Sequence, residues 1–433
     1  MKLFLRRLIA KGLEQAVVRL VRANPQLKIV AVGGSVGKTS TKLAIAAVLS
    51  QKYRVLVQEG NYNSQIGLPL MVFGQTVPSL LLNPFAWLVR FYRAERQIRG
   101  EFAYDVLVLE VGTDHPGEIA HFMTYLKPDI GVLTAVTPEH MEYFGNLDAV
   151  AAEEMALATG SKILVVNRDD VALAYRTKYL KHHPQVVTYG LTKDANYSAS
   201  VKDADLVGGT VCVLLKNGHA TIVGLTVGVY GEPAMKSATG AYAVGDLLEV
   251  PRAALEAGLK SVTPVAGRMR PLAGFNDSTI IDDTYNSSPD AVVAAIAALN
   301  NVPGTGRKLA VMGSMNELGV ESPRYHQEMG VVCAGVDMLV TIGEQANTYL
   351  GPAAVKAGLD PSNWKPADSP YAAGDFVKLI LQPGDIVLVK GSQNGVFAEE
   401  AAKLLLAHPA DASKLVRQSQ AWLSKKAKQF GVQ

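Results

Sequence analysis

The feature that most constrains the fold is an apolar run that leads directly into a glycine-rich loop and then into a helix-forming stretch. Residues 29–32 are Ile-Val-Ala-Val, and a helix is expected from about Thr39 to Gln51. This order is what a phosphate-binding loop requires, because glycines let backbone N–H groups turn toward phosphate oxygens, a lysine reaches the outer phosphates and a hydroxyl can hold Mg²⁺. We therefore predict a nucleotide site that contains Gly34, Ser35, Gly37, Lys38, Thr39 and Ser40.

The loop departs in one respect from the most common phosphate-binding pattern. The pattern G-x-x-x-x-G-K-[ST] would place a glycine at position 32, where this chain has Val32, so we interpret the loop as a shorter variant. The alternative is a glycine-rich turn that only opens a helix, since a Gly-Lys-Thr triplet also arises by chance. The order of strand, loop and helix favours the nucleotide site.

Length and composition limit the classes of protein to consider. A chain of 433 residues exceeds what one core usually supports, so we expect two or three domains. Cys212 and Cys333 lie far apart and fit neither a disulfide framework nor a C-x-x-C metal site, which indicates a reducing compartment. A net charge of +3 does not by itself predict nucleic-acid binding, and no uncharged apolar run is long enough for a transmembrane helix. We expect a soluble, cytoplasmic protein with no nucleic-acid partner.

Two stretches are nevertheless basic. Residues 1–26 have apolar residues at helical spacing and predict a basic amphipathic helix rather than an export signal, because charges interrupt the apolar run and no cleavage site follows. Residues 78–100 predict an inserted helix in which Arg90, Arg93, Arg96 and Arg99 recur beside aromatic side chains. Such helices can lie on a membrane surface or meet an anionic substrate; the alternative is a docked helix with solvated arginines. Peripheral contact with the inner membrane face, through residues 1–24 and 78–100, is therefore a hypothesis.

Beyond the loop, short apolar runs alternate with helical stretches, which predicts an α/β fold with mostly parallel sheets. Hairpins are expected over residues 197–229, at the edge of the first sheet, and a second alternation begins near Ile280. We predict a central P-loop nucleotide-binding domain over 27–266 and a Rossmann-like C-terminal α/β domain over 267–433. The strands predicted after the loop are residues 55–57, 105–111, 130–133, 163–166, 279–281, 309–312, 338–342 and 386–389.

Several motifs, in this order along the chain, resemble those of the Mur ligases. The resemblance covers roughly residues 28–400 and is closest to the MurF branch, which adds D-alanyl-D-alanine to a muramyl tripeptide. After the loop come Gly60-Asn-Tyr-Asn-Ser-Gln-Ile-Gly-Leu-Pro69, Leu109-Glu-Val-Gly-Thr-Asp-His-Pro-Gly-Glu-Ile119, Glu139-His-Met-Glu-Tyr-Phe-Gly145 and Val166-Asn-Arg-Asp-Asp170. The later motifs are Gly267-Arg-Met269, Ile281-Asp-Asp-Thr-Tyr-Asn-Ser-Ser-Pro-Asp290, Met312-Gly-Ser-Met-Asn-Glu-Leu-Gly319 and Val389-Lys-Gly-Ser392.

This resemblance implies an ATP-dependent amide ligase of peptidoglycan precursor synthesis. A substrate carboxylate would attack the γ-phosphate of ATP to give an acyl phosphate, and an incoming amine would then displace phosphate. By the same resemblance, Thr39, Glu110 and His140 would serve Mg²⁺, and Lys38 would contact the phosphates. The remaining residues that it implies are Arg268, Asp283, Tyr285 and Asn286 on the nucleotide, and Asn61, Asn63, His115, Lys390 and Ser392 on the substrates.

One departure from the family bears on the metal site. The family usually has a lysine, carbamylated to an acidic group, shortly after the His140 motif, whereas this chain has Ala151-Ala-Glu-Glu-Met155. Glu154, or as a second choice Glu153, would supply a permanent carboxylate, so metal support would not need bound CO₂. We therefore include Glu154 among the predicted catalytic and metal-binding residues. The alternative is a solvated helix face.

Other departures lie around the substrates and the nucleotide base. The His-Asn pair expected on the adenine side is replaced near Gly231-Glu-Pro-Ala-Met-Lys-Ser237, and Ala135, Ser314 and Gln393 stand where the family has asparagine, aspartate and arginine. The loop also begins near residue 33, where the family first carries a whole N-terminal domain for the uridine nucleotide, and the basic helix is too short to form that domain. We expect the acceptor to be held differently, or to be another carboxylate.

Three hypotheses follow from these motifs. The first is a MurF-type ligase that takes a muramyl peptide precursor and an amino acid or dipeptide. The second keeps the chemistry but changes the acceptor, in the manner of folylpolyglutamate or cyanophycin-type synthetases. The third is a membrane-associated scaffold that binds ATP but has lost ligation. Phosphate release that requires both a carboxylate and an amine separates the first two from the third, and acceptor screening separates the first two from each other.

Overall fold

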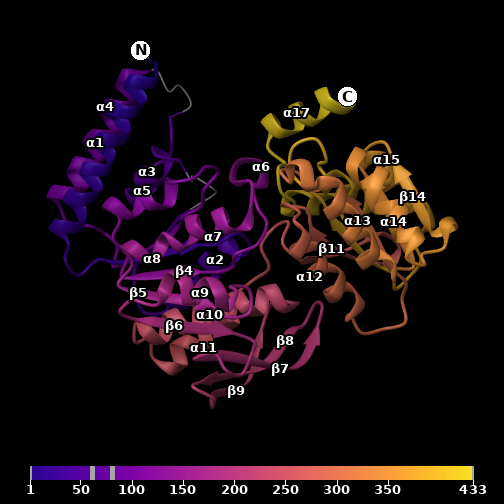
Figure 1. Ribbon diagram of the computed structural model, residues 1–433, viewed down its shortest axis with the longest axis horizontal. Helices are drawn as coiled ribbons and strands as arrows, with labels where there is room; N and C mark the ends of the chain where they lie inside the picture. The colour runs from indigo at the N-terminus through magenta and orange to yellow at the C-terminus, as the bar shows by residue number, and fades with distance from the viewer. Residues whose placement is uncertain (1, 59–63, 79–82, 432–433) are drawn as a thin grey trace.

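The computed structural model describes residues 2–58, 64–78 and 83–431, and these residues form two α/β units that lie side by side (Figure 1). One sheet is built from strands between residues 28 and 227, and the other from strands between residues 270 and 390. The chain therefore changes sheet close to residue 267. This change supports the boundary expected from the sequence, and we propose residues 27–266 and 267–433 as the two domains.

The first sheet has nine strands in the order β2-β3-β1-β4-β5-β6-β7-β8-β9. Their bounds are β1 (Lys28–Gly33), β2 (Val55–Val57), β3 (Val106–Glu110), β4 (Ile130–Leu133), β5 (Ile163–Asn167), β6 (Val186–Gly190), β7 (Tyr197–Asp205), β8 (Gly209–Lys216) and β9 (His219–Val227). Strand β1 lies inside the sheet, parallel to β3 and β4. Strands β7, β8 and β9 are antiparallel at one edge, which confirms the hairpins predicted there.

Both faces of this sheet are covered, and β1 shows how the sequence arranges this. Val30 and Val32 belong to the core on one face, whereas Ile29 and Ala31 belong to the core on the other, as the two-residue period of a strand requires. The first core also contains α2 (Lys38–Leu49), α10 (Glu232–Leu247) and α11 (Arg252–Lys260). The second contains residues of α1 (Lys2–Ala23), α3 (Gly67–Val72), α4 (Pro84–Arg99), α5 (Glu118–Tyr125), α7 (Leu147–Met155) and α8 (Leu157–Gly160). Helix α9 (Leu173–Leu180) adds Leu180 to the second core, and the unit also contains the short helix α6 (Met141–Phe144).

The second sheet has the order β10-β11-β15-β12-β13-β14, parallel except for β10. Its strands are β10 (Arg270–Ala273), β11 (Thr279–Asp283), β12 (Lys308–Gly313), β13 (Met338–Ile342), β14 (Trp364–Ala367) and β15 (Ile386–Lys390). One face packs on α12 (Pro289–Asn300), α13 (Ser322–Cys333) and α14 (Gly351–Lys356), and the other on α15 (Pro370–Ile380) and α16 (Glu399–Leu405). The unit ends with α17 (Gln420–Phe430), and its short 3₁₀ and π turns are η1 (Phe275–Asp277), η2 (Gly319–Glu321), η3 (Ala346–Leu350), η4 (Pro361–Asn363) and η5 (Pro409–Lys414).

The two basic stretches form a pair of neighbouring helices, α1 and α4, at one side of the first unit (Figure 1). Helix α4 begins where the Asn83 side chain accepts hydrogen bonds from the backbone N–H groups of Phe85 and Ala86, with Pro84 in the first turn. Its Trp87 side chain is buried with Ile9 and Leu13 of α1. Among the described residues, no helix is both long and apolar enough to cross a bilayer.

The strands predicted from apolar runs are confirmed, with bounds that differ by at most two residues at either end. Strands β6, β10 and β14 were not predicted. Two of them are edge strands that contain a proline, Pro271 in β10 and Pro366 in β14, and proline is tolerated at an edge because it lacks a donor for the ladder. A period-two pattern of apolar residues is absent from such short segments, so they resemble loops in the sequence.

Candidate active site

The loop between β1 and α2 is shaped by two glycines with positive φ. Gly34 has φ 119° and Gly37 has φ 87°, both in the region that side chains with a Cβ avoid. A Cβ at Gly34 would also lie 2.3 Å from the Thr134 hydroxyl oxygen, so the loop could not pack against the end of β4 with any other residue there. The loop therefore turns sharply at these two glycines and leads into α2, which begins directly after Gly37.

The Lys38 ammonium group lies inside this loop. Its Nζ donates to the carbonyl oxygens of Gly34 (2.6 Å) and Ser35 (3.0 Å), and lies 3.4 Å from a carboxylate oxygen of Glu139. Burial by itself would lower the pKa of Lys38, but the carboxylates of Glu139, Glu154 and Glu110 outweigh it and raise the pKa. A lysine held charged at this position can neutralise phosphate oxygens.

The structure brings Thr39 and Glu110 together beside the loop. The Thr39 hydroxyl is 3.0 and 3.2 Å from the two carboxylate oxygens of Glu110, which ends β3 directly opposite Val32 of β1. Lys42 forms an ion pair with the same carboxylate at 3.0 Å, and both side chains are only 1% exposed. The sequence analysis missed Lys42, although its position one turn after Lys38 on α2 places it on the same helix face.

Glu154 and Glu153 are both buried, and each accepts hydrogen bonds from a backbone N–H. Glu154 accepts from Gly34 N at 2.6 Å, so its carboxylate supports the loop from beneath, whereas Glu153 accepts from Gly117 N and Ile119 N at the start of α5. The pKa of Glu154 is raised to about 7, mainly by burial. The positive charge of Lys38 acts to lower this pKa, and the negative charge of Glu139 acts to raise it. The solvated helix face considered as the alternative is wrong for both residues.

His140 is held by a residue of the second unit. Its Nδ1 lies 2.7 Å from a carboxylate oxygen of Glu317, and its Nε2 lies 3.6 Å from Glu139 and 3.7 Å from Asp114. Burial would lower the pKa of His140, but the Glu317 and Glu139 carboxylates outweigh burial and the nearby Lys38, and the pKa is raised. In turn, the hydrogen bond from His140 lowers the pKa of Glu317. The sequence analysis did not select Glu317 or Glu139.

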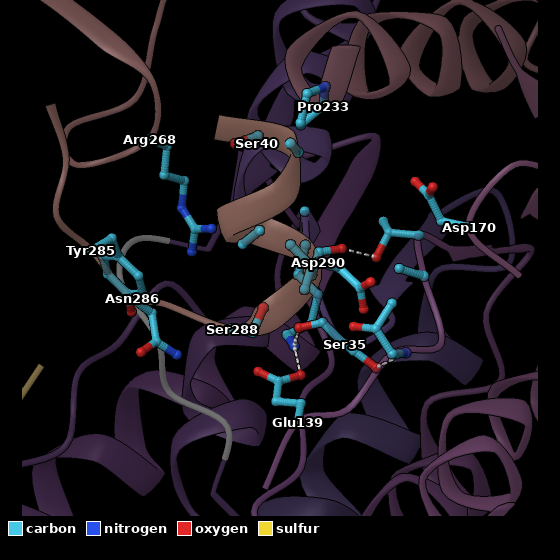
Figure 2. A pocket seen from close by; sticks show the side chains of 18 of the residues that line it. Ser35, Ser40, Glu139, Asp170, Pro233, Arg268, Tyr285, Asn286, Ser288 and Asp290 are labelled. Carbon is cyan, nitrogen blue, oxygen red and sulfur yellow. Dashed lines mark hydrogen bonds and ion pairs between the residues drawn. The ribbon is translucent and has the colours of Figure 1, made fainter. Parts of the chain in front are cut away.

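The second unit contributes the opposite wall of the site. Arg268 donates from Nη2 to the Thr39 hydroxyl at 3.1 Å, and its guanidinium carbon lies 4.3 Å from the centre of the Tyr285 ring. Lys390 donates to Asp283 (2.7 Å) and to the Asn286 carbonyl (3.0 Å). Figure 2 shows Arg268, Tyr285 and Asn286 on one side of the pocket, with Ser35 and Glu139 across from them.

These walls enclose a cavity of about 940 Å³ between the two units. This volume is at the upper end of the range for small-molecule sites, so it can hold a nucleotide together with part of a second substrate. At one end of the cavity, Lys236 donates to Asp170 at 2.7 Å. The pKa of the nearby Asp290 is raised, mainly by its burial and to a smaller extent by the negative charge of Asp170. Of the predicted site residues, the cavity is lined by Ser35, Gly37, Lys38, Ser40, Glu110, His140, Arg268, Asp283, Tyr285, Asn286 and Lys390.

Sequence comparison identifies the family. Residues 32–77 and 98–245 match the Mur ligase middle domain, and residues 267–393 match the Mur ligase glutamate ligase domain. The UDP-N-acetylmuramoyl-tripeptide–D-alanyl-D-alanine ligase of Synechocystis is 31% identical over 391 residues, which cover 88% of this chain and 76% of the relative. The chain belongs to the Mur ligase family.

Other relatives of this Mur ligase agree. The enzyme of the same name from Escherichia coli is 28% identical over 76% of this chain and 67% of its own length. Among solved structures, MurF from Acinetobacter baumannii superposes with a TM-score of 0.73 at 23% identity, covering 92% of this chain and 79% of that one. MurF from Thermotoga maritima, solved in complex with ADP, gives 0.71 at 24% identity, covering 91% and 83%. These two likenesses establish the shared fold.

Some positions that the Mur ligase resemblance implied lie away from the cavity wall. The His115 ring packs against Tyr143, with ring centres 4.7 Å apart, and the cavity-lining residues of the described chain do not include it. Ser392 is fully buried, and its hydroxyl accepts from Asn316 N (3.0 Å) and donates to the Ser287 carbonyl (3.4 Å). Asn61 and Asn63 lie outside the described residues. Substrate contacts by these four residues remain predictions.

Proposed function

We propose that this Mur ligase is an ATP- and Mg²⁺-dependent enzyme of the MurF type, which joins D-alanyl-D-alanine to a muramyl tripeptide. The observation that carries the proposal is the contact of Arg268 of one unit with the Thr39 hydroxyl of the other, where Thr39 also donates to Glu110 and directly follows Lys38 of the glycine-rich loop. The relatives supply the substrates, because three relatives that match most of the present chain are named for this reaction.

The proposed reaction needs charge neutralisation and positioning, and no protein nucleophile. The substrate carboxylate forms a bond to the γ-phosphorus as the bond to the β-phosphate oxygen breaks, which gives an acyl phosphate and ADP. The amine then attacks the acyl carbon, inorganic phosphate leaves and the amine loses a proton. Lys38 and Arg268 lie where they would neutralise the oxygens of the transferring phosphoryl group from two sides.

The residues present fit a magnesium ion that is bound mainly through the nucleotide. Mg²⁺ keeps several waters and takes one or two protein carboxylates plus phosphate oxygens. The described residues contain no group of three or more acidic, histidine or cysteine side chains that could hold a metal by itself. However, the Thr39 hydroxyl and the Glu110 carboxylate lie within 3.0 Å of each other, so both could contact one ion. Thr39 and Glu110 would hold one ion, and Nε2 of His140 would face a second. The bound metal would supply neutralisation of phosphate charge.

We further propose that Glu154 takes the place of the carbamylated lysine of the family. One of its carboxylate oxygens accepts from Gly34 N, so Glu154 would act at least through the loop, as a positioning residue. Asp283, Tyr285 and Asn286 are proposed for the nucleotide, and Lys390 for the incoming amino acid or dipeptide side. We propose His115 and Ser392 as residues near the substrates rather than in contact with the nucleotide.

The deciding experiment measures phosphate release from ATP with the uridine-linked muramyl tripeptide and D-alanyl-D-alanine, supplied together and then one at a time. Release should require both substrates and Mg²⁺, and Lys38→Ala should abolish it. Lys356→Ala, an exposed lysine on α14, is the matched control. ATP binding without release would refute the MurF assignment, and release with a folate or cyanophycin acceptor would assign the enzyme to another ligase reaction.

We propose the cytoplasm as the compartment in which the enzyme works. The reaction uses ATP, and both cysteines, Cys212 and Cys333, are free and buried. Burial raises the pKa of the Cys212 thiol to about 11, which keeps it protonated and unreactive. Cell fractionation, with the enzyme detected separately in the cytosolic, periplasmic and membrane fractions, would test the compartment.

A further inference from the structure

Helices α1 and α4 present a surface that plays no part in the ligase site. The two helices run parallel, because a Cβ at Gly12 would lie 3.2 Å from the Phe91 ring, and Arg19 pairs with Glu95 at 2.8 Å further along both helices. Figure 1 shows the pair side by side at the edge of the first unit, with the start of α1 pointing away from the sheets. The first turns of both helices therefore lie together at the outer end of the pair.

Large apolar side chains are exposed at this outer end. On α4, Phe85 is 70% exposed, Leu88 64% and Tyr92 68%, and their spacing of three and four residues places them on one helix face. On α1, Leu5 and Leu8 are 42% and 52% exposed. They precede Gly12 by seven and four residues, so they lie on the side of α1 that borders α4. Together these five residues form the apolar tip.

The apolar tip is not the result of poor packing beneath it. Trp87 of α4 is buried against a cluster that includes Ile9 and Leu13 of α1 and Leu70 of α3. The Glu14 carboxylate on α1 also reaches Nε2 of His121 on α5 at 2.7 Å. The helix pair is thus anchored on its inner side, and the exposed side chains face outward from a supported surface.

The charge around the apolar tip is positive and uncompensated. Arg6, Arg7 and Lys11 on α1 and Arg93 on α4 are all exposed, and none of them forms an ion pair with an acidic side chain of the described residues. Glu14 is occupied by His121, and Glu95 by Arg19 and Arg99. Cations that surround exposed leucine and aromatic side chains are typical of a helix that lies in the interface of an anionic membrane.

We infer that the apolar tip docks on an anionic lipid surface, with the leucine and aromatic side chains among the acyl chains and the arginines at the lipid phosphates. The charge selects this partner, because an apolar protein groove would leave four cations without counterions, whereas a lipid phosphate layer supplies them. The inference does not depend on the proposed reaction, since no residue of the apolar tip lines the cavity.

The test is cosedimentation of the full-length protein with vesicles of phosphatidylcholine alone and with phosphatidylglycerol added. We expect binding only to the anionic vesicles, weakened by salt. Phe85→Ser with Leu88→Ser should weaken binding by tenfold or more, and Arg6→Gln with Arg7→Gln by roughly tenfold or more. The matched control is Val320→Ser with Leu379→Ser, which removes two apolar side chains that are 94% and 86% exposed on the other unit.

Phosphate release by each variant shows whether the catalytic fold is intact, and it should be unchanged in all three. Failure to bind anionic vesicles, or equal binding by the Phe85/Leu88 variant and the control, would overturn the inference. So would light scattering that shows a dimer of the wild-type chain and a monomer of that variant, because the apolar tip would then be an interface between two copies.

Discussion

Nδ1 of His140 and a carboxylate oxygen of Glu317 lie 2.7 Å apart, although the two residues follow strands of different sheets. A backbone hydrogen bond from Glu142 N to Glu317 O, at 3.3 Å, runs beside this contact. Both His140 and Glu317 have positive φ, 51° and 66°. A side-chain contact and a backbone hydrogen bond therefore join the two units at the cavity edge, beside a candidate metal residue.

Glu317→Gln should lower the pKa of His140. In the wild type, the Glu317 carboxylate stabilises the protonated, positively charged form of His140. Without it, burial and the positive charge of Lys38, which both lower the pKa of His140, have a larger effect. The measurement is an NMR titration of the histidine ring protons, with the His140 signal assigned by its loss in His140→Gln. Glu321→Gln, whose partner is Arg324, is the control. An unchanged His140 titration in Glu317→Gln would show that the ion pair does not persist in solution.

Arg268→Lys should reduce turnover by about 10- to 100-fold while the protein remains folded. The guanidinium now contacts the Thr39 hydroxyl and stacks on Tyr285 at the same time, and a lysine ammonium has neither the planar shape nor the second donor. Arg270→Lys is a close control, since Arg270 donates to the Lys414 carbonyl on the surface. Wild-type turnover by Arg268→Lys would mean that charge alone suffices at this position.

Glu154→Ala should reduce turnover by about 10- to 100-fold, because the loop loses the acceptor for Gly34 N. Glu154→Gln keeps a carbonyl acceptor there, so it should retain more activity if the carboxylate acts through the loop, and as little as Glu154→Ala if its charge is needed. Wild-type turnover should not change when CO₂ is removed from the buffer. Full turnover by Glu154→Ala, with Glu101→Ala as control because the Glu101 side chain is 88% exposed, would remove Glu154 from the site.

Asp282 should make the stability of the second unit depend on pH. Burial raises its pKa from 3.8 to about 6, so between about pH 4 and pH 6 the unfolded chain is ionised at this residue while the folded chain is protonated. The stability that this group contributes at low pH is therefore lost as the pH rises, by roughly 3 kcal/mol. Asp282→Asn has no carboxylate to ionise at this position and does not lose this stability. In urea titrations, its free energy of unfolding should therefore increase relative to that of the wild type as the pH rises from about 4 to about 7.

Asp360→Asn provides a control of opposite sign for this experiment. Hydrogen bonds from Ser362 lower the pKa of Asp360, so the wild type should gain stability relative to this variant as the pH rises. If the free energy of unfolding relative to the wild type changed with pH in the same way for both variants, the pH dependence would come from net charge and not from the individual sites.

Much of the fold was predictable because buried parallel strands appear in the sequence as uninterrupted runs of apolar residues. Strands β2, β4 and β13 have the predicted bounds, and α1 forms where the basic helix was expected. Edge strands such as β14 were missed because one side of an edge strand faces solvent and its residues carry less apolar signal. The hairpin at β7–β9 was predictable from its glycines and from the Asn217-Gly218 turn.

The site was predictable where its residues are close together in the sequence, because their arrangement then depends only on local backbone structure. Gly34, Lys38 and Thr39 follow one another along the chain, so their arrangement depends on one loop. Contacts such as His140 with Glu317 depend on how two units close on each other, which no local pattern encodes. Lys42 was missed and Glu153 was only a second choice for a different reason. A charged side chain on a helix is usually solvated, and only the tertiary structure shows that these two are buried with partners.

The packing of α2 has a consequence for the order in which the enzyme is assembled on the ribosome. The inner face of α2 rests on α10 and α11: the Thr41 hydroxyl lies 3.1 Å from that of Ser237, and a Cβ at Gly258 would lie 2.6 Å from the Val48 backbone. A nascent chain that ends before α10 would carry the glycine-rich loop on a helix whose apolar side is still uncovered. The nucleotide site therefore matures only after α10 and α11 have been made, well after the loop itself has left the ribosome.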